Sequence, residues 1–294
     1  MLNILLTALL IFVSGNQAPS GQICPGDLIF EDTFDELNLK KWQHELTLGG
    51  GGNWEFELYS NNRTNSYVQD GILHIKPTLL ADETGEDFLY HGTLDINGGT
   101  PVDQCTNAQW YGCERTGGPD GILNPIKSAR VRTVDSFSFK YGRVDVRAKL
   151  PGGDWLWPVD STLHFGPNYN YNRYEYAHFE KNNAGGYDTN FHTYGMLWSQ
   201  IVCSFYVDEE VIGTVTPPAG GFGNWSFIFI LNLAVGGVNY FPDNANNPGG
   251  KPWLNDSPKA STDFWEGRDQ WLPTWHLGTD DSHLQVDHIR VWAL

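Results

Sequence analysis

Short stretches of alternating apolar and polar residues run through most of this chain, separated by glycine, proline, asparagine and aspartate. The clearest stretch is 141–150, in which Val144, Val146 and Ala148 alternate with charged residues. Side chains of a strand point alternately to the two faces of a sheet, so this period of two predicts a strand with one buried face. Further strands are expected at 67–76, 128–134, 205–211, 226–235 and 284–292.

Helical periodicity is scarce. Only residues 35–46 could form a turn or two of helix, because nothing else sustains a period of 3.6. Many strands with turn signals between them predict an all-β fold, a concanavalin-like β-sandwich (jelly roll) of two antiparallel sheets. Such sheets stack about 10 Å apart. Their curvature leaves a concave face on which a long polymer could lie.

The N-terminus predicts export. Residues 2–13 are almost wholly apolar, and no charged side chain occurs before Asp27. Small residues at Ser14, Gly15 and Ala18 suit cleavage, so residues 1–18 are expected to be a secretory signal peptide. The alternative is a retained signal anchor, although the apolar run is short for a membrane span. No linker or repeat divides the rest, so residues 19–294 are expected to form one domain, secreted and extracellular, with no membrane partner.

Four cysteines permit three pairings. Cys105 and Cys113 lie close together in the sequence, so a disulfide between them is expected, with Cys24 and Cys203 as the remaining pair. An oxidising compartment suits both bonds. Three triplets of the Asn-x-Ser/Thr type are candidate glycosylation sites if they are exposed; they begin at Asn62, Asn224 and Asn255.

The chain is strongly acidic, with a formal net charge of −17. Phosphate backbones and anionic membranes would be repelled, which disfavours nucleic acid as a partner. Twelve tryptophans and 13 tyrosines fit a neutral polyol ligand; the alternative is that the charge serves only solubility. The glycine run 49–52 lacks the ending of a phosphate loop, and His164, His178 and His192 lack zinc-ligand spacing. We therefore expect no cofactor and a monomer.

Seven segments, in order along the chain, carry a family resemblance; they are Leu28–Phe34, Asn53–Arg63, Phe139–Pro158, Ser161–Pro167, Phe191–Trp198, Ile230–Gly237 and Val286–Val291. Together they resemble the family 16 glycoside hydrolases, in particular endo-β-1,3-glucanases and the invertebrate β-1,3-glucan-binding (Gram-negative bacteria-binding) proteins. The resemblance runs from about Asp27 to the C-terminus. It implies a jelly-roll domain that recognises β-1,3-glucan, with a possible part in innate immunity.

The family's catalytic strand has no counterpart. A retaining glycosidase places two carboxyl groups roughly 5–5.5 Å apart, and family members carry them on a strand reading Glu-x-Asp-x-Glu or Glu-x-Asp-x-x-Glu. Here Pro158 runs directly into Val159, and neither pattern occurs in the chain. Glu175 and Glu180 have the spacing but lack the central Asp, and Asp160 alone cannot supply two roles. No catalytic residue is assigned, and the fold is expected to be incomplete near 158–160.

Resemblance also suggests binding residues, since aromatic rings stack on the apolar faces of sugars. The expected substrate-binding residues are Trp54, Arg63, Trp155, Trp157, His192 and Asn232. Core packing is the alternative for each tryptophan, and a structural role is the alternative for His192. Relatives often hold a structural calcium on the convex side, where Asp287 would be one ligand; a surface aspartate is the alternative.

Three hypotheses follow from the sequence. The first is a secreted binder of β-1,3-glucan without catalysis. The second is an endo-β-1,3-glucanase, hydrolysing O-glycosidic bonds by a retaining mechanism, whose recorded chain lacks the catalytic exon. The third is a damaged isoform that neither binds nor cleaves.

Overall fold

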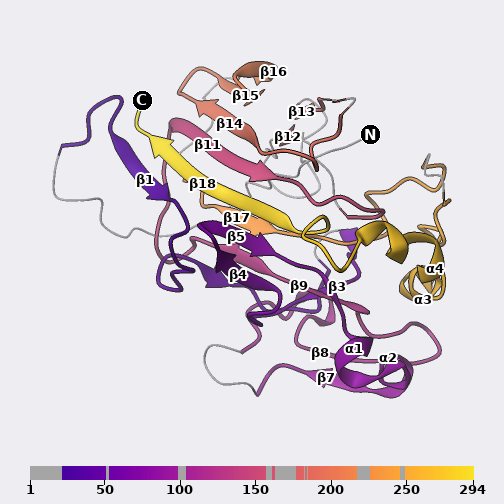
Figure 1. Ribbon diagram of the computed structural model, residues 1–294. Coiled ribbons are helices and arrows are strands. Elements are labelled where there is room, and N and C mark those ends of the chain that lie inside the picture. Colours follow the sequence, from indigo (N-terminus) through magenta and orange to yellow (C-terminus); the bar gives the residue numbers. More distant parts are fainter. Residues whose placement is uncertain are drawn as a thin grey trace.

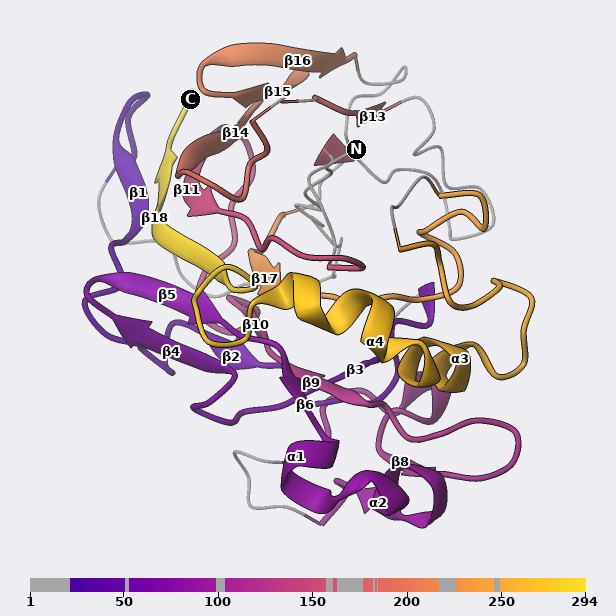
Figure 2. The same cartoon turned by 45° about the vertical axis from the view of Figure 1, so that its right-hand side comes forward.

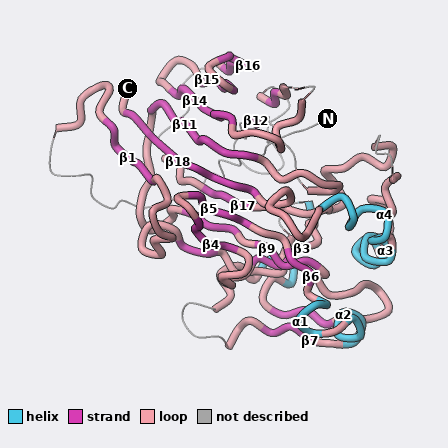
Figure 3. The backbone as a smooth tube through the Cα atoms, viewed as in Figure 1, coloured by secondary structure: helices cyan, strands magenta, loops and turns pink. Residues whose placement is uncertain are grey.

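The computed structural model describes residues 22–50, 53–98, 104–156, 161–162, 177–181, 183, 185–216, 226–245 and 249–294. Most of these residues form strands and loops, and short helices lie at one side (Figures 1 and 3). The helices are α1 (Ala81–Thr84), α2 (Glu86–His91), α3 (Ala260–Glu266), α4 (Arg268–Trp271) and two 3-10 turns, Gln109–Tyr111 and Leu272–Trp275. None of the helices in these ranges is long and apolar enough to cross a bilayer.

An eight-stranded antiparallel sheet forms one layer. Its strands in spatial order are β16 (Glu210–Val215), β15 (Cys203–Val207), β14 (His192–Trp198), β11 (Gly142–Lys149), β18 (Leu284–Trp292), β5 (Ile72–Ile75) and β4 (Ser66–Gln69), with β1 (Leu28–Asp32) beside the far end of β18. Residues along β11 alternate between buried and half-buried positions, as its sequence predicts.

Shorter strands form the opposing layer. One group is β17 (Ile230–Asn232), β10 (Arg130–Arg132) and β2 (Gln43–His44), and a second is β3 (Glu57–Tyr59), β9 (Ile126–Ser128) and β6 (Thr78–Leu79). Two pairs stand apart, β7 (Thr93–Asp95) with β8 (Glu114–Thr116) and β12 (Ser161–Thr162) with β13 (His178–Phe179). Strands β3 and β9 are parallel, so the expectation of purely antiparallel sheets is wrong at this pair.

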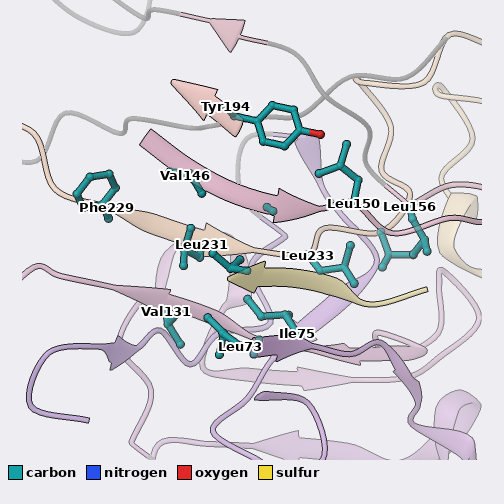
Figure 4. Packing of buried hydrophobic residues seen from close by; sticks show 14 of the residues in the cluster. Leu73, Ile75, Val131, Val146, Leu150, Leu156, Tyr194, Phe229, Leu231 and Leu233 are labelled. Atoms are coloured by element: carbon teal, nitrogen blue, oxygen red, sulfur yellow. The ribbon is translucent and has the colours of Figure 1, made fainter. Parts of the chain in front are cut away.

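The hydrophobic core lies between the two layers (Figure 4). Leu73 and Val146 of the large sheet point toward Val131 and Leu231 of the smaller layer, and all four side chains are buried. The predicted two-layer β-sandwich is confirmed. Because Val131 points inward, its neighbours on β10 present their side chains to the opposite, outer face of this layer.

Two segments that were each predicted as one strand form β-hairpins in the structure. Residues 67–76 turn at Asp70 and Gly71, whose φ angles are 54° and 76°, and the chain returns as β5. Residues 205–211 turn at Asp208 and Glu209, also with positive φ. Two successive left-handed residues fit the tight turn that matches strand twist. The Asp-Gly pair is a strong hairpin signal that could have been read from the sequence.

The helix expected at 35–46 does not form. Trp42 is buried and its indole N–H donates to Asp32 at 2.7 Å, so this segment is held by a tertiary contact, and residues 43–44 form β2. Helices do form elsewhere: α3 and α4, gold at the centre and right of Figure 2, bury Phe264 and Trp271. The predicted signal peptide at 1–18 and the expected gap at 158–160 lie outside the described residues.

Candidate functional site

The outer face of the smaller layer carries a row of polar side chains. Arg130 and Arg132 leave β10 on this face, and Arg130 lies opposite Asn232 of β17 in the antiparallel register. Glu45 follows β2 and bonds both guanidinium groups, at 3.6 Å from Arg130 Nη1 and 3.2 Å from Arg132 Nη1. Tyr59 of β3 completes the row, since its hydroxyl accepts a hydrogen bond from Asn232 Nδ2 at 3.0 Å.

Two more carboxyl groups lie beneath this row. Glu55 and Glu57 are two residues apart on β3 and its approach, and their side chains are 6% and 0% exposed. Glu57 Oε2 accepts the backbone N–H of Val235 at 2.8 Å, and its carboxylate also bonds the Tyr59 hydroxyl. The Arg130 guanidinium lies 4.4 Å from the centre of the Tyr59 ring. We call Glu45, Glu55, Glu57, Tyr59 and Arg130 the acidic cluster.

Burial dominates the electrostatics of this cluster. It raises the pKa of Glu55 to about 7, with Arg130 opposing the shift. It raises the pKa of Glu57 to about 8, and the neighbouring charge of Glu55 adds to the effect. A buried carboxyl group is costly to ionise, so a proton bound to it is stabilised.

The pair Glu55 and Glu57 does not form an exposed catalytic dyad. A retaining glycosidase needs both carboxyl groups within reach of one sugar bond. Here both are covered, and one is fixed by a backbone N–H and a tyrosine hydroxyl. In this structure the two carboxyl groups are therefore buried within the protein rather than exposed on its surface.

Exposed aromatic side chains lie beside the acidic cluster. Trp54, Trp110 and Tyr111 are 41%, 40% and 74% exposed, and all three have positive φ. The backbone of Gly49 packs against the segment around Trp110, and the backbone of Gly50 packs against the segment around Trp54. A Cβ atom at Gly49 would lie 2.8 Å from the Gln109 carbonyl and 3.7 Å from the Trp110 ring, and one at Gly50 would lie 2.5 Å from the Glu55 carbonyl next to Trp54. Glycine is needed at both positions because no side chain fits.

A disulfide holds the loop that carries two of these aromatics. Cys105 and Cys113 are bonded, as predicted. The loop docks on residues 46–48 through several hydrogen bonds, which include Leu46 N to Thr106 Oγ1 at 2.9 Å, Thr47 Oγ1 to Asn107 O at 2.8 Å, and Leu48 N to Gly112 O at 2.8 Å. We call residues 105–113 the disulfide loop and Trp54, Trp110 and Tyr111 the aromatic platform.

The sequence model for "Glycosyl hydrolases family 16" matches residues 152–251. A β-1,3-glucan-binding protein of Penaeus monodon is 40% identical, over 91% of this chain and 90% of that protein. This chain belongs to family 16 of the glycosyl hydrolases, in the group of the β-1,3-glucan-binding proteins. β-1,3-Glucan-binding protein 1 of Manduca sexta is 32% identical, and the chain spans 66% of its length.

Solved structures support the family 16 fold. The laminarinase from Rhodothermus marinus aligns with 91% of this chain and 97% of its own, with a TM-score of 0.55 at 18% identity. The endo-β-1,3-glucanase from Pyrococcus furiosus aligns with 91% and 94%, with a TM-score of 0.55 at 21% identity. The predicted jelly-roll class is thereby confirmed.

The family alignments also show that this member lacks residues that its relatives have. The alignment with the Penaeus monodon protein extends over 333 positions, whereas this chain has 294 residues. Part of the relative therefore lies opposite gaps in this chain. The alignment with the Manduca sexta protein is equally long.

The sequence-predicted binding residues of this family 16 chain separate into two groups. Trp54 and Asn232 lie at the platform and the polar row, and Arg63 Nη2 lies 3.0 Å from His44 Nε2 on β2 of the same layer. His192 lies on the large sheet, where its Nδ1 is 2.6 Å from Asp208 Oδ2. The structural alternative therefore fits His192.

Trp155, another predicted binding residue, does not join the platform. Trp155 is only 5% exposed, and its ring packs edge-on against Phe241 and Trp253, with centroids 5.3 and 5.0 Å away. Core packing, the alternative for this residue, is what the structure has, because the ring is covered. Trp157 lies outside the described residues. Trp110 and Tyr111 were missed by the sequence reasoning, although two adjacent aromatics inside a short cysteine loop were a readable signal.

The structure also places the remaining residues named from the sequence, and it corrects one expected disulfide. Cys24 and Cys203 do not pair: Cys24 is exposed near the start of the described chain, and Cys203 is buried in β15. The Asp287 carboxylate forms an ion pair with the Arg147 guanidinium at 2.5 Å, and calcium binding by Asp287 stays a prediction. Glu180 Oε1 lies 3.2 Å from His178 Nε2, on the surface. Glu175 and Asp160 lie outside the described residues.

The glycosylation candidates differ in access. Asn62 is exposed, and its side-chain Oδ1 accepts a hydrogen bond from the Thr64 backbone N–H at 2.9 Å. Asn255 is half-buried, and its Nδ2, the atom that would carry the glycan, donates to the Phe241 carbonyl at 2.9 Å. Asn224 lies outside the described residues. Asn62 therefore remains the predicted site, and a glycan on Asn255 would break an internal hydrogen bond.

Removing the disulfide should loosen the platform. In the double substitution Cys105→Ser and Cys113→Ser, the unfolded chain regains the entropy of a loop whose ends are 8 residues apart. We expect the free energy of unfolding to fall by about 2.5 kcal/mol, measured by urea unfolding. Cys24→Ser, at an exposed free cysteine, is the matched control and should unfold like the parent. Equal curves for all three proteins would contradict a constraining role.

Proposed function

We propose that this chain is a secreted β-1,3-glucan-recognising protein that binds the polymer without cleaving it, in a pattern-recognition role at microbial surfaces. The observation that carries the proposal is the aromatic platform: three exposed aromatic rings on braced backbone next to a row of polar groups. The names of the Penaeus monodon and Manduca sexta relatives support it. Export fits the disulfide of the loop, since such bonds persist in oxidising compartments.

A neutral polysaccharide suits this surface. Aromatic rings offer large rigid contact areas at small entropy cost, and the apolar faces of glucose rings can stack on them. The net charge of −17 repels anionic polymers but not a neutral glucan. The half-buried Arg132 and Asn232 at the edge of the row can hydrogen-bond sugar hydroxyls, which supplies orientation.

Three observations support the proposal that the protein does not cleave the glucan. The sequence contains no Glu-x-Asp strand at either family spacing, and the relatives have residues opposite gaps in this chain. The acid pair that the described residues do contain is covered. In addition, among the strands of the described ranges, β17 pairs on one side only, with β10, which leaves an edge where a further strand would fit.

Binding to insoluble β-1,3-glucan tests the proposal. Trp54→Ala and Trp110→Ala are each expected to weaken retention about tenfold, or about 1.4 kcal/mol, because a central aromatic contact is lost. Ile201→Ala, an exposed apolar residue in the turn between β14 and β15, is the control and should bind like the parent. Unchanged binding by both tryptophan variants would contradict a role for the platform.

Hydrolysis of β-1,3-glucan is the competing function, and an activity assay on the same protein preparation tests for it. We expect no release of reducing sugar from soluble β-1,3-glucan. Turnover that is abolished by Glu55→Gln or by Glu180→Gln would overturn the binder proposal. Reading the genomic interval between the codons for Pro158 and Val159 gives an independent result, because a Glu-x-Asp strand encoded there would support the glucanase hypothesis.

A further inference from the structure

Two histidines far apart in the sequence face each other on the large sheet. His74 lies on β5, and His283 lies one residue before β18, beside it. Their Nδ1 atoms are 3.4 Å apart across a sequence separation of 209 residues. Both side chains are almost fully buried, although they point away from the core that Leu73 and Ile75 enter.

A carboxylate completes the group. Asp280 Oδ1 lies 3.2 Å from His283 Nδ1, and the three ligand atoms all lie within 4.8 Å of one another. The backbone around Asp280 is fixed, since its carbonyl accepts a hydrogen bond from Gln285 Nε2 at 3.1 Å and the His283 N–H at 3.1 Å. Its side chain is about half exposed, so it has room to rotate toward the rings.

The distances between these ligand atoms match those around a tetrahedrally coordinated metal ion. When ligands lie 2.0–2.1 Å from zinc at the corners of a tetrahedron, neighbouring ligand atoms are about 3.3 Å apart. The two distances, 3.4 Å between the histidines and 3.2 Å from His283 to Asp280, have this length. A small rotation of Asp280 brings the third edge to the same value and leaves a fourth position open to solvent.

Without a cation, the Nδ1 atoms of His74 and His283 and the Asp280 carboxylate have too few protons between them for every lone pair to accept a hydrogen bond. A neutral imidazole has one N–H, so one Nδ1–H can bridge to the other ring or to the carboxylate, but not to both. The remaining lone pairs then face each other in a buried place, which costs free energy. A cation satisfies all three lone pairs at once.

The surroundings hold the rings in place and keep them neutral. Tyr67 stacks on His74 with centroids 4.9 Å apart and planes at 1°. Burial lowers the pKa of His283 to about 4, an effect that Lys76 and Lys149 reinforce and Asp280 opposes. Asp70 also faces His74, whose pKa is likewise lowered by burial. Neutral imidazole is the form that coordinates metals.

We propose that His74, Asp280 and His283 bind a divalent transition-metal ion, zinc by the fit of its nitrogen and oxygen ligands, and that the ion ties β5 to the loop before β18. This site is separate from the aromatic platform and does not depend on the proposed function. Its expected effect is on stability, because a ligand bound only by the folded state shifts unfolding. Sequence spacing could not reveal it, since the ligands meet only through strand pairing.

The test uses the tag-free full chain with Cys24→Ser, which removes an exposed thiol that also binds zinc. After chelation and dialysis, calorimetric titration with zinc chloride should show one site, and zinc should raise the melting temperature. Asp280→Asn should weaken zinc binding at least tenfold while the protein still folds, because its side chain is half exposed. His74→Asn should abolish binding.

The matched control lies in the same loop. His276 Nδ1 is 3.2 Å from Asp281 Oδ2, an exposed pair with the same chemistry, so His276→Asn with Asp281→Asn should leave zinc affinity unchanged. Cobalt(II) provides a readout that does not require the histidine variant to fold: the parent should show the visible absorption of a four-coordinate ion, and Asp280→Asn should alter it. Absence of zinc binding by the parent, or equal loss in the control, would overturn the proposal.

Discussion

Replacing Arg130 with methionine is expected to lower the free energy of unfolding by about 3–5 kcal/mol. Arg130 lies among three buried glutamates: its Nη1 is 3.6 Å from Glu45, and its charge opposes the raised pKa of Glu55. Methionine keeps much of the side-chain length but leaves these carboxyl groups without their countercharge. Removing one partner of a buried charge pair is costly because the other stays desolvated. Urea unfolding at pH 7 measures the loss.

An exposed ion pair provides the control. Arg290 Nε lies 2.7 Å from Glu31 Oε1 between β18 and β1, and both side chains are more than one-third exposed. Water screens such pairs, so Arg290→Met should cost no more than about 1 kcal/mol. Similar losses in the two variants would show that Arg130 does not compensate buried charge.

The second large effect is on the pH dependence of stability. Glu55 and Glu57 have pKa values of about 7 and about 8 in the folded protein, against 4.5 for an unperturbed glutamate. At pH values between 4.5 and their folded-state pKa values, Glu55 and Glu57 are protonated in the folded protein but ionised in the unfolded chain. Raising the pH therefore favours unfolding, by about 1.4 kcal/mol per pH unit for each such proton. The free energy of unfolding should fall from about pH 5 to about pH 8, measured by urea unfolding across that range.

The substitution Glu57→Gln tests whether Glu57 causes this pH dependence of stability. Glutamine keeps the oxygen that accepts the Val235 N–H but does not ionise. The variant should be more stable than the parent at pH 8, and its stability should depend less on pH. Glu31→Gln, at an exposed carboxylate, is the control and should leave the slope as it is in the parent. A Glu57→Gln curve parallel to that of the parent would contradict the raised pKa.

These two predictions bear on how the proposed binding surface is maintained. The acidic cluster lies beside Arg132 and Asn232 of the polar row, and Glu57 bonds both Val235, three residues after β17, and Tyr59. Loss of the cluster should therefore disturb the smaller layer as a whole. The aromatic platform has a separate brace, the disulfide loop, so its contribution to binding can be tested without altering the buried charges.

Local pattern predicted a good part of the fold. The strand at 284–292 has the bounds that its alternation predicts, and β11 differs by one residue at each end. These strands have one face in the core, so their composition follows directly from burial. The turns at 70–71 and 208–209 were overlooked because apolar residues on both sides continue the strand pattern through them.

The sites were harder to predict for a physical reason. Glu55 and Glu57 read as ordinary polar residues of a strand, and their raised pKa values arise from burial in the packed protein and, for Glu57, from the neighbouring charge of Glu55. Trp155 reads as a sugar contact by resemblance, yet Phe241 and Trp253 cover it. Whether a tryptophan is exposed depends on what packs over it, which a single sequence does not record.

The amino-acid sequence alone determined the β-sandwich class, the Cys105–Cys113 disulfide, the family and the absence of a Glu-x-Asp strand, because each follows from local periodicity, short spacing or ordered motifs. Only the tertiary structure decided which aromatics are exposed, which acids are buried around Arg130, and that His74 meets His283. Those properties depend on contacts between residues far apart in the chain, whose distances and desolvation exist only once the sheets have packed.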